Sequence, residues 1–246
     1  MKFRLLFRWL ILLAFCASLF GPVPVAYAQP QPQTKTVEAM LESMSPEERI
    51  GQLFLVNFRG TNINSDSQIY DLIVNHHVGG VVLTASNDNF ADEPDTVSGA
   101  NQLINSLQTI EWDSASQGIS GNTSRNAYVP LFVGISQDGD AAPHDQILSG
   151  LTPLPDAMAI GANWRTDLAK RVGSVLGSEL SALGFNLLLG PAFDVAESPN
   201  PSSVSDLGTQ VFGGDPFWAG EMGRAYVTGL HTGSNNRMVV IAKHFP

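Results

Sequence analysis

The sequence predicts an α/β protein of the (β/α)8 TIM-type barrel class, incomplete, with about five of the eight βα units present. From residue 36 onward, helical patterns alternate with short apolar runs. Four of the five runs are continuously apolar, as expected of parallel strands buried on both faces. Polar residues collect directly after the runs. A doubly wound open sheet is the alternative, but residues 59–62 (Arg-Gly-Thr-Asn) stand where its Gly-rich phosphate loop would follow the first strand.

The first units start with apolar residues at helical spacing over 37–44. Ser45 then caps a second helix, with Pro46 at its first position and two acids in its first turn. Strands are predicted over 54–58 and 79–84, on either side of a helix whose apolar face runs from Ile69 to His76.

The remaining pattern predicts three further strands, each preceded by a helix. The predicted elements are a helix over 97–110, a strand over 131–135, a helix over 167–183, a strand over 185–189, a helix over 217–231 and a strand over 238–242. The stretch 101–126 is rich in Ser, Gly, Asn and Gln and predicts a long solvated loop, which overlaps the end of the first of these helices.

The amino terminus has the layout of a secretory signal peptide over 1–28. Three cations precede the apolar run 9–20, and Ala26-Tyr27-Ala28 forms the cleavage site. A membrane anchor is the alternative, but the run of about 12 residues is shorter than the ~20 that cross a bilayer. Cys16 could indicate a lipoprotein, although bulky Phe15 precedes it. We expect an exported protein, periplasmic or extracellular, without a stable membrane anchor after cleavage.

Residues 29–35 predict a flexible leader, and 36–246 a single barrel domain. The 13 Lys+Arg stand against 23 Asp+Glu, a formal net charge of −10, which argues against a nucleic-acid or anionic-membrane partner. The one cysteine lies in the signal peptide, so the mature chain has no thiolate site. His76, His77 and His231 lie at predicted helix ends and indicate helix termini rather than metal ligands, so we expect no metal and no cofactor.

Residues that can hold a polyol gather after the predicted strands. Lys243 and His244 follow the last strand and offer adjacent hydrogen-bond donors, although strand-end charges are also commonly just solvated. Asp194 ends the fourth strand and could orient a cation or cap a turn. Asp138 and Asp140 follow the third strand, where an ordinary Asx turn is the alternative to a site.

Read in order, these motifs resemble the N-terminal barrel of glycoside hydrolase family 3. Residues 130–140 (PLFVGISQDGD) resemble the family's strand with D-Q-E-G-G, and 154–162 (LPDAMAIGA) its P-x-A-M-A-L-G-A segment. Residues 184–195 (GFNLLLGPAFDV) are similar to G-I-N-x-x-x-A-P-x-x-D-V, and 212–216 (FGGDP) to F-G-x-D-P. Residues 242–246 (AKHFP) match the first half of A-K-H-F-P-G-H-G.

The resemblance implies a retaining β-glycosidase acting on O-glycosyl bonds, with an oligo- or polysaccharide or a glycoside as substrate. The spelling Lys-His-Phe-Pro favours the β-N-acetylhexosaminidase branch, with β-glucosidase possible. Lys243 and His244 would bind hydroxyls of the glycosyl unit, Asp194 would line that site, and Asp138 belongs to the substrate-binding set. The nucleophile and the acid/base are expected after Pro246, in an open reading frame that continues with Gly-His-Gly, so the chain as given is expected to be inactive.

Four positions depart from the family pattern. Ser136 replaces the Asp that grips sugar hydroxyls, Gln210 replaces an Arg, Asp138 replaces the Glu and Asp140 replaces the second Gly. Neutral Ser136 and Gln210 lose charge-assisted hydrogen bonds worth ~1.5 to 3 kcal/mol each. A non-catalytic, exported carbohydrate-binding relative is therefore the second hypothesis. A periplasmic solute-binding protein is a distant third, because such proteins have two doubly wound lobes.

Overall fold

The computed structural model describes residues 37–117, 127–139, 144–196 and 207–244. The chain divides into two compact units, residues 1–39 and 40–246, and only residues 37–39 of the first are described. The predicted signal peptide and leader therefore lie outside the described residues. Within the described ranges, no helix has the length and apolar character needed to cross a membrane.

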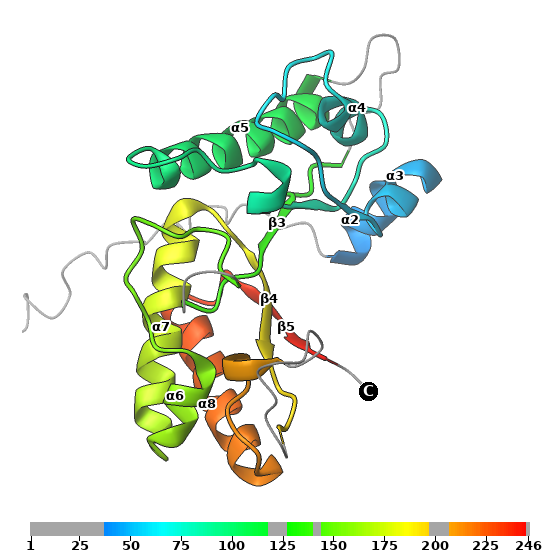
Figure 1. Ribbon diagram of the computed structural model, residues 1–246. Coiled ribbons are helices and arrows are strands. Elements are labelled where there is room, and N and C mark those ends of the chain that lie inside the picture. Colours follow the sequence, from blue (N-terminus) through cyan, green and yellow to red (C-terminus); the bar gives the residue numbers. More distant parts are fainter. Residues whose placement is uncertain (1–36, 118–126, 140–143, 197–206, 245–246) are drawn as a thin grey trace, which may run out of the picture. The chain divides into compact units, whose positions relative to one another are not determined.

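The second unit is built on a five-stranded parallel sheet in which every strand pairs with the next one along the chain (Figure 1). A doubly wound sheet reverses its strand order, whereas a barrel keeps it sequential, so the order supports the barrel. The strands are β1 (Leu55–Val56), β2 (Gly80–Val82), β3 (Phe132–Ile135), β4 (Leu187–Ala192) and β5 (Val239–Lys243).

The helices follow the predicted alternation, with one addition. They are α2 (Val37–Ser43), α3 (Pro46–Gly51), α4 (Gln68–Val74), α5 (Thr96–Gln117), α6 (Ala157–Ala162), α7 (Thr166–Leu183) and α8 (Pro216–Gly233), with 3-10 turns η1 (Ala85–Asn87) and η2 (Gly208–Gln210). Helix α6 was not expected from periodicity because it has only six residues. It begins where the Asp156 carboxylate accepts a hydrogen bond from the Ala159 backbone N–H at 2.6 Å.

The predicted loop over 101–126 is wrong for its first part, because α5 continues to Gln117. The Asn, Gln and Ser residues of this stretch lie mainly on the partly solvated side of the helix, while Leu103, Ile104, Leu107 and Ala115 are buried. A long helix with a narrow apolar stripe has a polar composition similar to that of a loop. Residues 118–126 lie outside the described residues.

The predicted start of α3 is confirmed in detail. The Ser45 hydroxyl accepts from the Glu48 backbone N–H at 3.1 Å, and the Glu48 carboxylate accepts from the Ser45 N–H at 2.6 Å. This reciprocal pair is a capping box, with Pro46 at the first helical position. Glu48 is buried, and its second oxygen accepts from the Ala127 N–H at 3.1 Å, so the cap also anchors the chain that leads into β3.

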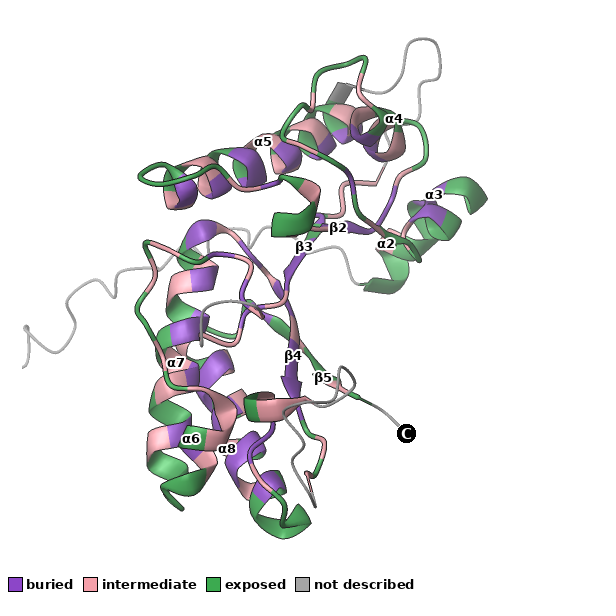
Figure 2. Ribbon diagram, in the orientation of Figure 1, coloured by how far each residue is buried: buried purple, intermediate pink, exposed green. Residues whose placement is uncertain are grey.

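Strand β4 is almost wholly buried, whereas β5 is exposed or half-buried along its length (Figure 2), and the side chains on the two faces of the sheet also differ in burial. Val81, Val133 and Leu188 share the face that packs into the core with the helices, and all three are buried. The opposite face carries large apolar side chains that remain between 42% and 46% exposed at Leu55, Phe132, Val239 and Ile241. In a barrel this second face lines the interior.

Helices α7 and α8 lie side by side next to β4 and β5 (Figure 1) because glycines let their backbones meet. A Cβ added to Gly229 of α8 would lie 2.0 Å from the Lys170 carbonyl oxygen of α7. A Cβ on Gly177 of α7 would lie 2.4 Å from the Leu230 carbonyl oxygen. No side chain fits at either position without separating the helices.

Asn186 joins three strands at the point where β4 begins. Its side-chain Oδ1 accepts from the Val133 N–H at 2.7 Å, and its Nδ2 donates to the Leu131 carbonyl at 2.9 Å. Its backbone carbonyl accepts from the Val239 N–H at 2.8 Å. One half-buried residue therefore connects β3, β4 and β5. Its side chain and backbone give hydrogen-bond partners to backbone groups of the neighbouring strands, next to the ends of their ladders.

We expect Asn186→Ala to lower the free energy of unfolding by about 1 to 3 kcal/mol, because the Val133 N–H is then buried without its acceptor. Urea denaturation of the full-length protein measures this loss. Asn105→Ala is the matched control, since the exposed Asn105 amide donates to Asn101 on its own helix and has no other hydrogen-bond partner among the described residues. Equal effects of the two substitutions would contradict the role assigned to Asn186.

Two glycine substitutions on α8 should act in opposite directions. Gly229→Ala forces a methyl group into the α7 backbone and should lower the thermal unfolding midpoint. A Cβ on Gly220 meets nothing within 4 Å, so Gly220→Ala should raise stability by about 0.5 to 1 kcal/mol through helix propensity. A neutral or stabilising Gly229→Ala would show that the helices are not held at backbone contact.

Candidate functional site

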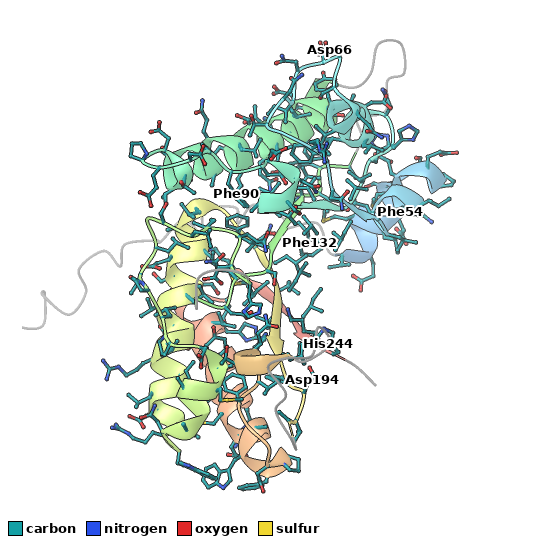
Figure 3. The ribbon with its side chains drawn as sticks, in the orientation of Figure 1. Phe54, Asp66, Phe90, Phe132, Asp194 and His244 are labelled. Atoms are coloured by element: carbon teal, nitrogen blue, oxygen red, sulfur yellow. The ribbon has the colours of Figure 1, made fainter. Side chains whose placement is uncertain are left out.

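The carboxyl ends of β4 and β5 bring two predicted site residues into contact. The pairing of the strands places Ala192 opposite Lys243, so the residues that follow each strand are neighbours. The Asp194 carboxylate accepts from the His244 backbone N–H at 3.0 Å, and the same Oδ2 lies 3.0 Å from His244 Nδ1 (Figure 3). Residues 50 positions apart in the chain thus form one unit at the end of the sheet where barrels build their sites.

The Asp194–His244 contact keeps the carboxylate charged and leaves the imidazole accessible. Partial burial would raise the pKa of Asp194, but hydrogen bonds from the His244 side chain and backbone outweigh it and lower that pKa. The His244 side chain is 56% exposed and the Asp194 side chain 31%. With Nδ1 on the carboxylate, Nε2 of His244 is directed away from Asp194 and available to a ligand.

Lys243 supplies a cation beside this pair. It is half-buried at the last position of β5, and its backbone carbonyl accepts from the Phe193 N–H at 2.5 Å. Among the residues that the structure describes, its ammonium group has no hydrogen-bond or ion-pair partner. Three donor protons are therefore free for hydroxyl groups at this edge of the sheet.

A second polar pair joins the loops after β3 and β4. Gln210 Nε2 donates to Asp138 Oδ2 at 3.2 Å, and both residues are half-buried. The Asp138 carboxylate also lies against β4, since a Cβ built on Gly190 would be 3.5 Å from its Oδ1. Gln210, which replaces the Arg of the family pattern, thus binds Asp138, which replaces the Glu of that pattern.

Two buried side chains that the sequence reasoning did not select support this turn. Asp145 Oδ1 accepts from the backbone N–H groups of Asp138 and Gly139, at 2.7 and 2.9 Å. Gln137, 2% exposed, accepts from the N–H groups of Gln146 and Ile147 at 3.0 Å and donates to the Ile147 carbonyl at 2.8 Å. No spacing in the sequence indicated these contacts, because they close a loop of irregular backbone.

The predicted substrate-binding residues therefore fall into two groups. Lys243, His244 and Asp194 lie together, whereas Asp138 is placed with Gln210. Ser136 is half-buried and directly follows β3, as the sequence predicts. Asp140 lies outside the described residues.

Glu111 is a buried carboxyl group with a raised pKa, but it lies away from the candidate site. Burial raises its pKa to about 7, with the nearby Glu48 raising it further and a backbone hydrogen bond at Val129 opposing the shift. Val129 precedes β3, so Glu111 lies at the amino end of the strands, opposite to His244. The perturbed pKa therefore reflects the packing of α5 against the chain before β3 rather than a role in this site.

Two of the histidines that the sequence assigns to helix ends, His231 and His76, lie at such ends in the structure. His231 is in the last turn of α8, and His76 follows α4 with its Nε2 at 3.5 Å from Asp71 Oδ2. In the described part of the chain, no group of three or more His, Cys, Asp or Glu side chains could hold a metal ion.

A model of the glycosyl hydrolase family 3 N terminal domain matches residues 45–246. The chain is 27% identical over 212 residues to a beta-N-acetylglucosaminidase/beta-glucosidase of Cellulomonas fimi, covering 85% of this chain and 31% of that protein. It is also 27% identical over 182 residues to beta-hexosaminidase A of Pseudoalteromonas piscicida, covering 73% of this chain and 26% of that protein.

The fold is similar to that of a family 3 beta-N-acetylglucosaminidase from Paenibacillus sp. str. FPU-7, with a TM-score of 0.66 and 27% identity. That comparison covers 82% of this chain and 33% of the Paenibacillus chain, so this chain spans about a third or less of the length of these three relatives. The likeness confirms the prediction of an incomplete TIM-type barrel. Since the family model matches most of the sequence, the protein belongs to glycosyl hydrolase family 3, with its N-terminal domain in residues 45–246.

Proposed function

We propose that the protein is an exported, retaining β-glycosidase and that Lys243, His244 and Asp194 hold the glycosyl unit of its substrate. The observation that carries this proposal is the Asp194–His244 contact at the carboxyl ends of β4 and β5, next to Lys243, whose ammonium has no partner among the described residues. The names of the relatives favour a β-linked N-acetylhexosamine as the sugar, with glucose as the second choice. The predicted signal peptide supports export.

The three residues divide the work of binding. Lys243 donates hydrogen bonds to one or two sugar hydroxyls, and its charge strengthens them. His244 offers Nε2 to a neighbouring hydroxyl, while Asp194 fixes the orientation of the ring through Nδ1. Asp194 also accepts the His244 backbone N–H, so ring and backbone are held by one carboxylate oxygen.

The bond-breaking carboxyl groups are proposed to come from residues beyond Pro246. A retaining glycosidase needs a nucleophile and an acid/base whose pKa is raised so that it can donate a proton. The lowered pKa of Asp194 does not suit the acid/base role. Its Oδ2 accepts from His244, which leaves that oxygen engaged rather than open for nucleophilic attack. Asp138 is held by Gln210. Both carboxylates are therefore suited to position groups rather than to perform the displacement.

A second candidate function is non-catalytic carbohydrate binding. Neutral Ser136 and Gln210 stand where the family pattern has Asp and Arg, and the Gln210 amide forms a neutral-to-charged hydrogen bond where an Arg would form an ion pair. Such a protein would keep Lys243, His244 and Asp194 for recognition and would show affinity without turnover.

Lys243→Ala should lower kcat/KM of the full-length protein on an aryl β-N-acetylglucosaminide by about 10- to 100-fold, since charge-assisted hydrogen bonds contribute about 1.5 to 3 kcal/mol. Asp194→Asn should cost about tenfold through the misplaced imidazole. Lys170→Ala removes a lysine that is exposed on α7 and serves as the matched control. Activity unchanged by both site variants would overturn the proposal, whereas sugar affinity without hydrolysis in the unmodified protein would favour the second function.

The 246-residue chain assayed by itself should release no aryl alcohol from these substrates, because the proposed nucleophile is not among its residues. A fluorogenic assay beside the full-length protein makes the comparison. Hydrolysis by the 246-residue chain, abolished by Asp194→Asn or Asp138→Asn, would show that the catalytic carboxyl groups lie within it.

A further inference from the structure

Three large aromatic side chains stand exposed at the amino ends of α7 and α8. Trp164, Phe217 and Trp218 are 58%, 66% and 37% exposed. The rings of Trp164 and Trp218 meet edge to face at 5.0 Å, and those of Phe217 and Trp218 at 5.5 Å. We call these three residues the aromatic shelf; clustered exposed apolar side chains of this kind often mark an interaction site.

The shelf borders a cavity of about 260 Å³. Its lining includes Trp164, Trp218 and the buried Phe212, together with Gly213, Gly214 and Asp215. Asp215 Oδ1 accepts from the Trp218 N–H at 3.0 Å and caps α8. A Cβ added to Gly213 would meet no described atom within 4 Å, so the cavity is open above that residue. Flat rings beside hydrogen-bonding groups are suited to a ligand with an apolar face and a polar edge.

Two aromatic rings link the candidate sugar site to the cavity beside the shelf. Phe193, the neighbour of Asp194, contacts Phe212 with ring centres 6.4 Å apart, and Phe212 lines the cavity. Helix α7 follows β3, after α6, and α8 follows β4, so both helices begin at the carboxyl end of the sheet. Their first turns therefore lie at the same end as His244. The shelf cavity and the candidate sugar site thus lie at the same end of the sheet and are linked by the Phe193–Phe212 contact.

We propose that the aromatic shelf binds a further unit of a β-linked oligosaccharide, a subsite in addition to the one at Lys243, His244 and Asp194. A pyranose ring presents C–H groups on one face and hydroxyls around its edge, which matches indole faces beside the Asp215 carboxylate. Among the described residues, the shelf and the cavity lining carry one carboxylate, Asp215, and no cation that would select a phosphate or an acidic partner. This inference rests on the proposed function for its choice of sugar.

The test is isothermal titration of the full-length protein with chitotetraose, cellotetraose and N-acetylglucosamine. Trp164→Ala and Trp218→Ala should each weaken tetrasaccharide binding by about tenfold, as expected for the loss of one stacking contact, and leave N-acetylglucosamine binding within about twofold. Trp112→Ala is the matched control: Trp112 is 55% exposed and edge to face with Tyr128, at the amino end of the strands. Phe217→Ala serves as a further variant if Trp218→Ala unfolds.

Full tetrasaccharide affinity in the shelf variants would overturn the proposal. The proposal would also be overturned if the unmodified protein sediments as a dimer and the shelf variants as monomers that still bind the tetrasaccharide. The shelf would then be a contact between copies of the chain. The inference and the proposed function can fail separately: if Lys243→Ala and Asp194→Asn leave N-acetylglucosamine binding unchanged while the shelf variants lose tetrasaccharide binding, the shelf stands and the assigned site does not.

Discussion

Backbone groups at the ends of short parallel strands need hydrogen-bond partners, and polar side chains supply them throughout this sheet. Asn186 provides an acceptor and a donor where β3 and β4 begin. Asp145 accepts two backbone N–H groups after β3, and Asp194 accepts the N–H that follows β5. Strands of two to six residues form few ladder hydrogen bonds, so these side-chain contacts add to the pairing at the strand ends.

The same requirement builds the candidate site. Asp194 completes the end of β5 by accepting the His244 N–H, and the contact brings the imidazole and its neighbour Lys243 to a defined place. The structural role and the proposed binding role therefore coincide in one carboxylate, whose pKa is lowered because His244 donates to it against the effect of burial. Binding residues that also complete a strand are held on the rigid part of the fold, as precise recognition of a sugar requires.

Continuous apolar runs and cap residues were sufficient to predict the five strands, the start of α3 and the position of Lys243 and His244 at a strand end. Periodicity failed where composition was ambiguous: α5 has the polar content of a loop, and α6 is too short to show a period. The pairing of Gln210 with Asp138 and the support from Asp145 could not be predicted, because both depend on how irregular loops fold back in space. Asp194 was selected from its place after a strand, but its partner became evident only from the register of β4 and β5.

The most direct test of this account is a crystal structure of the full-length protein with N-acetylglucosamine bound. We expect the sugar hydroxyls within hydrogen-bond distance of Lys243 Nζ and His244 Nε2, with His244 Nδ1 still on the Asp194 carboxylate. A sugar bound elsewhere, or an imidazole turned away from Asp194 in the complex, would contradict the central claim that this carboxylate organises the site.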